Sequence, residues 1–125
     1  MNSAAVYAWL AASAPVTALL GSPPRLYPLT APDSITGTDG GSSYATYQGV
    51  TGRPENTFAG SAGADFVRVQ IDAYARSYVD AQALATTIAE ALDARGYVVS
   101  WNGETWDQDV RRFRVSFDFE FFATR

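Results

Sequence analysis

One stretch near the end of the sequence alternates in a way that fits a β-strand with two different faces. Hydrophobic residues take every second position, namely Phe113, Val115, Phe117, Phe119 and Phe121. Between them lie Arg112, Arg114, Ser116, Asp118 and Glu120. Successive side chains of a strand point to opposite faces of the sheet, so one face is apolar and the other is charged. We therefore expect a sheet that is covered on its apolar face, with a charged face left for water or a partner.

A second long segment, from Asp65 to Arg76, has the same two-faced pattern. Its apolar positions are Val67, Val69, Ile71, Ala73 and Ala75, and its other positions are Arg68, Gln70, Asp72 and Tyr74. If the two segments are antiparallel neighbours, one register places Arg68 beside Asp118 and Asp72 beside Arg114. That register pairs opposite charges twice, and it is our prediction for the sheet.

Shorter patterns predict the remaining elements. We expect helices over 2–13 and from Pro15 to Gly21, and strands over 25–29 and 44–51. Ser77 begins a capping box for an alanine-rich helix that we expect to end at Arg95, with Gly96 as its stop. A strand over 97–101 is followed by Asn102-Gly103, a strong hairpin signal. This order predicts an α+β fold: an antiparallel sheet of about four to five strands with helices packed on one face.

Composition narrows the class of protein. A chain of 125 residues fits one domain, residues 1–125. It contains no histidine, cysteine or lysine, which excludes Ser-His-Asp, Cys-His and Ser-Lys nucleophilic catalysis. The net charge of -4 argues against direct binding to nucleic acid. Pro15 interrupts the apolar beginning, so we expect neither a membrane helix nor a secretion signal.

Carboxylates are the remaining candidates for chemistry. Glu104, Asp107 and Asp109 form an acidic cluster, but it lacks the glycine and the terminal glutamate of a calcium loop, and a solvated acidic turn is favoured. Each carboxylate of the long strands has an arginine nearby, which would lower its pKa and spoil a general acid. No glycine-rich phosphate loop is found. The sequence predicts no cofactor, no metal site and no enzymatic activity.

The charged face of the sheet is the first candidate for function. Its residues are Arg68, Gln70, Asp72, Arg112, Arg114, Asp118 and Glu120. They can form a solvated face with weak ion pairs, or a contact between identical copies or a lumen. All nine basic residues are arginine, which is enriched at interfaces whereas lysine is depleted.

Two polar segments, 30–43 and 52–63, are the second candidate. Their glycine, serine and proline content predicts loops, and long loops in small domains are often ordered by a partner. The alternative is a mobile surface loop. Their candidate contact residues are Thr36, Asp39, Ser42, Arg53, Glu55 and Asn56.

Several segments together are similar to a known family. They are Ala14-Pro15-Val16-Thr17-Ala18-Leu19-Leu20-Gly21, Arg25-Leu26-Tyr27-Pro28-Leu29, Tyr47-Gln48 with Val50-Thr51-Gly52, Arg68-Val69-Gln70-Ile71-Asp72-Ala73-Tyr74-Ala75 and Phe113-Arg114-Val115-Ser116-Phe117-Asp118-Phe119. With these segments in this order, the chain resembles members of the tail terminator, or tail-completion, family of long-tailed bacteriophages and gene-transfer particles.

The resemblance implies a structural virion protein of the head-tail junction, present in the host cytoplasm during assembly. Members are expected to form a hexameric ring that caps the tail tube and joins it to the head connector or head-closure protein. DNA would be a partner only by passing through the lumen. Two alternatives stay open: a head-closure or adaptor ring of the same junction, and a monomeric α+β binding module.

Overall fold

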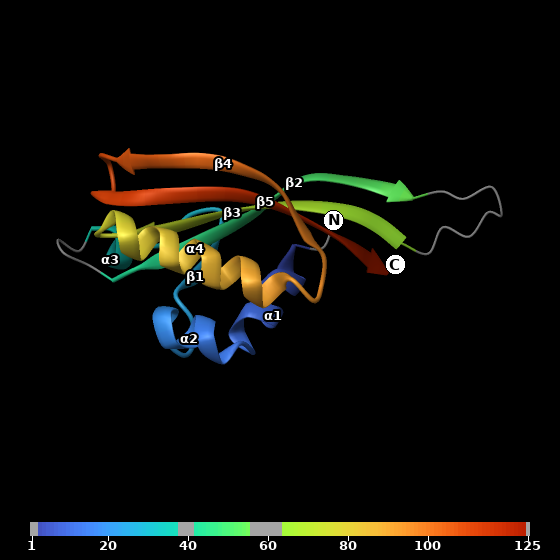
Figure 1. The fold of residues 1–125 in the computed structure, drawn as a ribbon, viewed down its shortest axis with the longest axis horizontal. Coiled ribbons are helices and arrows are strands. Elements are labelled where there is room, and N and C mark those ends of the chain that lie inside the picture. The colour runs from blue at the N-terminus through green and yellow to red at the C-terminus, as the bar shows by residue number, and fades with distance from the viewer. Residues whose placement is uncertain (1–2, 38–41, 56–63, 125) are drawn as a thin grey trace.

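Five strands form one sheet in the order β1-β2-β3-β5-β4, antiparallel except for the parallel pair β1 and β2. The computed structural model describes residues 3–37, 42–55 and 64–124. The strands are β1 (Leu26–Pro28), β2 (Tyr44–Glu55), β3 (Ala64–Ala75), β4 (Tyr97–Asp107) and β5 (Arg112–Thr124). The helices are α1 (Ala4–Ala11), α2 (Ala14–Leu20), α3 (Asp33–Thr36) and α4 (Tyr78–Leu92). This is the expected α+β fold (Figure 1).

The two long alternating segments are the centre of the sheet. They form β3 and β5, which pair along their whole length. All five predicted apolar residues of β3 are fully buried, and Val115 to Phe121 of β5 are at most 4% exposed at the apolar positions. The predicted apolar faces are therefore confirmed, and they meet the helices.

Helix α4 lies against β3 and β5, and α1 and α2 pack against α4 (Figure 1). The N-cap of α4 is Ser77, as the sequence predicted. The Ser77 hydroxyl accepts a hydrogen bond from the backbone amide of Asp80 at 3.1 Å. The alanines and leucines of α4, Ala81, Leu84, Ala85 and Leu92 among them, are buried in the core. None of the helices in the described part of the chain is long and apolar enough to cross a membrane.

The end of α4 differs from the prediction. The helix ends at Leu92, before Arg95, and Gly96 lies beyond it in the approach to β4. A Cβ at Gly96 would collide with the backbone carbonyl of Glu120 on β5. Gly96 is therefore needed because two backbones approach closely, and not as a helix stop.

The hairpin predicted at Asn102-Gly103 was wrong, because β4 runs without interruption to Asp107. Gly103 has φ 115° at an irregularity in the pairing with β5, so its freedom serves a bulge and not a turn. The chain turns after Asp107, where the Asp107 carboxylate accepts a hydrogen bond from the Asp109 amide at 3.0 Å. Arg111 completes this turn with φ 53°.

Strand β2 is also longer than predicted, because it continues from Thr51 to Glu55 and pairs there with the start of β3. The expected loop over 52–63 therefore begins later. Pro54 is tolerated in this part of β2 because β1 pairs only with Ala45 to Tyr47, which leaves the far half of β2 at the sheet edge.

A second, smaller apolar cluster lies on the face of the sheet away from α4. Tyr44 of β2 and Tyr74 of β3 are cross-strand partners whose rings stack with centroids 4.6 Å apart. Ile35 of the short helix α3 and Val110 pack against them. One end of the polar sheet face is thus covered by the segment around α3.

Candidate functional site

The predicted polar face of β3 and β5 is present, although the pairing register of the two strands differs from the prediction by two residues. Arg68 lies opposite Glu120, and Asp72 lies opposite Ser116. A shift of two residues keeps every side chain on its face, so the hydrophobic pattern fits both registers and could not decide between them. The charge pairing that we used to choose the register was too weak to fix it.

Arg68 is the centre of the ionic contacts on this face. Its Nη2 lies 3.2 Å from Oε1 of Glu120, and its Nη1 lies 3.9 Å from Oδ2 of Asp118. The Asp118 carboxylate also accepts a hydrogen bond at 2.8 Å from the amide of Asn102 on β4. The Arg68 side chain is 38% exposed whereas both carboxylates are mostly covered, so the cation is the more accessible partner.

A second group continues the polar face toward Tyr74. The Gln70 amide donates to both carboxylate oxygens of Asp72 at 3.2 Å. Arg114 lies opposite Tyr74 and hydrogen-bonds to it. Burial raises the pKa of Tyr74, with a further increase from the negative charge of Asp72. These side chains satisfy one another and leave a mixed, ordered polar surface.

Arg112 does not belong to the accessible part of the face. It is only 1% exposed, and its guanidinium donates to the carbonyl oxygens of Ile35, Thr36, Ser42 and Val110 at 2.9 to 3.4 Å. The guanidinium also lies over the Tyr44 ring, 5.0 Å from its centroid. The single chain therefore uses Arg112 to hold its own backbone, and the expectation that it meets water or a lumen is wrong for this residue.

The loop candidates fall into three groups. Thr36 ends α3 and Ser42 precedes β2, and the carbonyl oxygens of both are acceptors of Arg112. Arg53 and Glu55 belong to β2 by their backbone. Asp39 and Asn56 lie outside the described residues. The structure thus holds both ends of the segment 37–41 at one end of the sheet.

The sequence analysis missed a surface on β4. Trp101 and Trp106 are about half exposed, at 55% and 47%. The covered part of the Trp101 ring packs against Phe117 of β5, and that of Trp106 packs against Phe113. Tyr78, at the start of α4, is 44% exposed and packs on the same Phe113. The signal was two tryptophans in a short polar segment, and the mistaken hairpin at Asn102 concealed that one strand carries both.

A groove of about 400 Å³ lies between α4 and β4. Its lining residues are Gln82, Thr86, Trp101, Gly103, Glu104 and Val115. The Glu104 carboxylate accepts hydrogen bonds from the Tyr78 hydroxyl at 2.8 Å and the Gln82 amide at 2.7 Å. The bond to Glu104 raises the pKa of the Tyr78 hydroxyl, because it favours the protonated phenol beside an anion.

The acidic cluster predicted from Glu104, Asp107 and Asp109 does not converge on a metal. Glu104 is held by α4, and Asp107 caps the turn. In the ranges that the structure describes, no three acidic side chains are grouped closely enough to hold an ion. With no histidine, cysteine or lysine in the sequence, these surfaces offer contacts and not catalysis.

Comparison with known proteins finds a matching family and solved structures of similar fold. The model of one family, "Tail completion protein gp17", matches residues 4–124. A chain in the solved structure "Virion of native gene transfer agent (GTA) particle" has a similar fold, with a TM-score of 0.59 and 18% identity over 96% of this chain and 92% of that one. No curated protein is similar enough to count as a match.

The family match and this structural match carry different weight. At 18% identity the likeness to the gene transfer agent chain shows a shared fold alone. The family match spans nearly every element, from α1 to β5, and confirms the resemblance that the sequence segments suggested. The chain belongs to the tail completion protein gp17 family, and it is a structural protein of a phage-type tail and not an enzyme.

Proposed function

We propose that the chain assembles into a ring, a hexamer, that caps the tail tube and joins it to the head connector or head-closure protein. Membership of the tail completion family is the observation that carries this proposal. The absence of histidine, cysteine and lysine from the sequence and the exposed aromatic surface on β4 support it. The protein would then act by shape at the head-tail junction, after assembly in the host cytoplasm.

The polar sheet face is the proposed lumen or subunit contact. Apart from Arg112, its residues are Arg68, Gln70, Asp72, Arg114, Asp118 and Glu120, of which Asp72 and Glu120 are only 8% exposed. Most of these groups are already paired with one another, so the face is suited to a neighbour that does not need to break those pairs. The acidic net charge supports passage of DNA past such a face without strong binding.

The segment between α3 and β2 is the proposed contact with a partner ring or tube. Arg112 of β5 donates to the carbonyl oxygens of Thr36 and Ser42, which lie at the two ends of this segment. A partner bound to the segment would therefore be coupled directly to the sheet. Arg53, Glu55 and Asn56, together with Asp39, stay as proposed contact residues on the sequence argument.

The experiment that tests the function measures mass and location together. Purified protein is expected to form a ring of defined mass, alone or when assembled tail-tube protein is added, and to decorate one end of the tubes in electron micrographs. Binding to the portal complex without tube-end binding would indicate a head-closure protein instead. A protein that stays monomeric under both conditions would favour a monomeric binding module and contradict the ring.

A further inference from the structure

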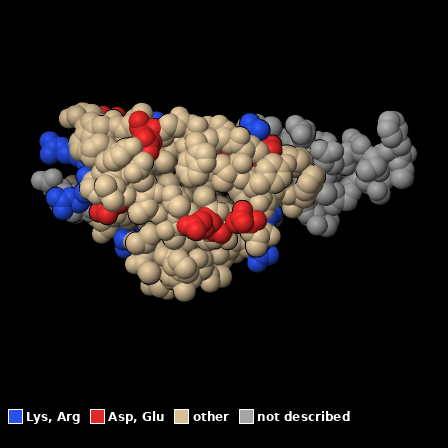
Figure 2. Space-filling model, viewed as in Figure 1, with Lys and Arg blue, Asp and Glu red and all other residues tan. Residues whose placement is uncertain are grey.

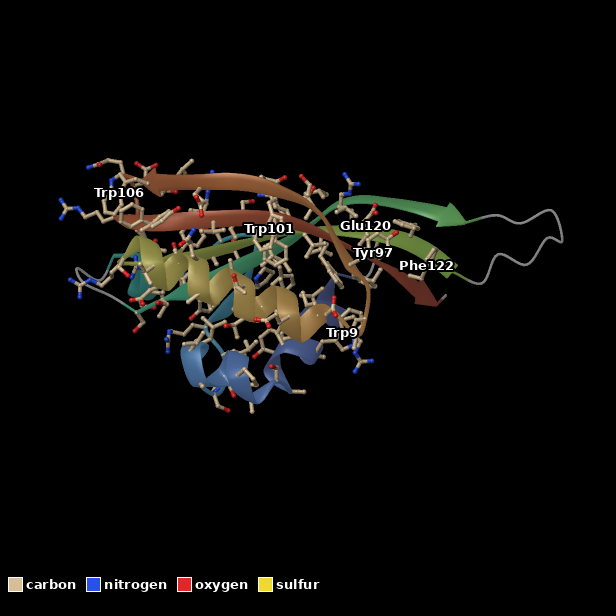
Figure 3. The ribbon with its side chains drawn as sticks, viewed as in Figure 1. Trp9, Tyr97, Trp101, Trp106, Glu120 and Phe122 are labelled. Atoms are coloured by element: carbon tan, nitrogen blue, oxygen red, sulfur yellow. The ribbon has the colours of Figure 1, made fainter. Side chains whose placement is uncertain are left out.

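The two edges of the sheet are strand β4 at one side and the short strand β1 at the other. The β4 edge is rich in exposed aromatic rings, those of Trp101 and Trp106 among them (Figure 3). The exposed Tyr78 of α4 packs on the same Phe113 ring as Trp106. Helix α4 packs mainly on β3 and β5 and reaches β4 through the bonds of Tyr78 and Gln82 to Glu104, so about half of each tryptophan ring stays exposed. This is the reason that rings placed on the helix side of the sheet still meet water.

The groove between α4 and β4 is lined by apolar residues, Trp101 and Val115, and by smaller or polar ones. Gly103 is part of the lining but contributes no side chain, and a Cβ built there would meet nothing within 4 Å. Thr86 is exposed on one wall and Trp101 forms the other. Glu104 is fixed at the rim by Tyr78 and Gln82 and does not swing across the opening. The groove is thus preformed, apolar inside and polar at one rim.

The β1 edge presents an apolar side chain in an unusual way. Leu29 follows β1, is 70% exposed and has φ 67°, a left-handed conformation that leucine rarely adopts. Its amide donates to the Tyr47 carbonyl at 2.9 Å, and the next amide, of Thr30, donates to the Pro28 carbonyl at 2.7 Å. These bonds hold the strained backbone in place. A strained residue that exposes a large apolar group points to a contact outside the single chain.

We propose that the groove between α4 and β4 of one copy receives the β1 edge of the next copy, with Leu29 entering the groove beside Trp101. The proposal rests on the ring proposed above and names the surfaces that join it. Because β1 and β4 are opposite edges of one sheet, each copy uses different surfaces for its two neighbours. Such a head-to-tail contact repeats until the ring closes.

The exposed area agrees with a contact that needs ring closure. Covering the open halves of Tyr78, Trp101 and Trp106 would remove on the order of 300 Å² from water, since such side chains bury about 150–250 Å² each. A stable interface buries about 800 Å² per partner. The aromatic patch therefore supplies less than half of one partner's share, so one edge contact is weak and a closed ring, in which every copy makes two, is favoured.

Cysteine cross-linking tests the pairing, because the chain contains no cysteine of its own. A variant with Leu29→Cys and Thr86→Cys is expected to give a ladder of disulfide-linked multimers up to the ring under mild oxidation. Each single variant is expected to stay uncross-linked, since position 29 meets position 86 and not itself. The control pair Leu19→Cys with Thr86→Cys uses another exposed leucine, in α2, and is expected to give no ladder.

A polar substitution tests the role of the side chain without adding strain. Leu29→Asn places a residue that tolerates the left-handed conformation, so the Tm is expected to stay equal or rise while ring formation falls at least tenfold in midpoint concentration. Leu19→Asn is the control and is expected to leave the ring intact.

Each outcome decides one proposal. Rings that form without a 29–86 ladder, or that survive Leu29→Asn unchanged, would overturn the edge pairing and leave the ring standing. A dimer cross-linked by Leu29→Cys alone would overturn it as well, since it would indicate a symmetric contact. A wild-type protein that is monomeric alone and with tail tubes would contradict the ring and the edge pairing together.

Discussion

At the level of single residues, Arg112 and Arg68 are the same amino acid on the same sheet face with opposite roles. Arg112 is buried and fixes carbonyl oxygens from both sides of the segment 37–41. Arg68 is partly exposed, and its guanidinium contacts the carboxylates of Glu120 and Asp118. The sequence pattern places both in the polar row and cannot separate them, because the difference comes from α3 folding over one end of that row.

Arg112→Met is expected to lower the free energy of unfolding by about 3 kcal/mol, because it leaves several buried carbonyl oxygens without a donor. Arg68→Met, the matched control, is expected to cost less than about 1 kcal/mol, as for other partly exposed ion pairs. Urea unfolding of both variants measures the difference. Equal losses would contradict the assignment of Arg112 to the interior.

Tyr44 gives a second prediction for a single residue. Burial, followed by the influence of Tyr74, raises the pKa of Tyr44 to about 12. The unfolded phenol titrates near pH 10, so the folded state binds the proton more tightly between about pH 10 and 12. Stability is therefore fully present below pH 10 and falls as the pH rises toward 12, where ionisation favours unfolding.

Thermal unfolding from pH 9 to 12 measures this fall. The sequence has no lysine to titrate in this range, so the other tyrosines are the competing groups. Tyr44→Phe retains the stacked ring and is expected to lose less stability than the wild type over these pH values. An equal fall in both proteins would assign the effect to other tyrosines.

At the level of elements, the sequence predicted what depends on local periodicity and missed what depends on how elements are placed beside one another. β3, β5 and the start of α4 were correct, because alternation and a serine cap are local signals. The groove beside β4 could not be predicted, since it depends on α4 lying mainly over β3 and β5. The Asn-Gly signal at Asn102 was overridden by pairing of the whole strand with β5.

Gly96 and Gly103 make a matched test of these element contacts. Gly96→Ala is expected to cost about 3 kcal/mol, because its Cβ would collide with the Glu120 carbonyl of β5 and neither backbone can move freely. Gly103→Ala meets open space and is expected to cost about 1 kcal/mol, for the positive φ alone. Urea unfolding measures both, and a smaller loss for Gly96→Ala would show that β4 can separate from β5 at that end.

At the level of the whole molecule, surfaces that point in different directions are assigned different roles. The two sheet edges are proposed to meet neighbouring copies, α1, α2 and α4 cover one sheet face, and the polar face of β3 and β5 is then free to line a lumen. The charged groups in Figure 2, which are dispersed and interrupted by wide uncharged areas, agree with contacts made mainly by shape on that side of the molecule. In a symmetric ring, any charge on a face near the axis is repeated in every copy.

Because of this repetition, a change of charge on the polar face is expected to affect the assembled ring more than the single chain. Replacing Arg68→Glu together with Arg114→Glu leaves only acidic charges around Asp118, Glu120 and Asp72. In the monomer the cost is expected to stay near 1–2 kcal/mol, because these were partly exposed pairs screened by solvent. In the ring the added carboxylates of neighbouring copies repel one another as well, so ring formation and tail completion are expected to be lost while the fold persists.

Circular dichroism and mass measurement on the same sample separate these two effects, and raising the salt concentration to about 0.5 M should recover part of the ring, since charges are then screened within a few ångströms. The control Arg76→Glu with Arg95→Glu changes the net charge equally at exposed positions outside β3 and β5, and it is expected to assemble normally. Normal assembly of the Arg68 and Arg114 variant at low salt would instead indicate that the polar face is exposed to solvent and belongs neither to the lumen nor to a subunit contact.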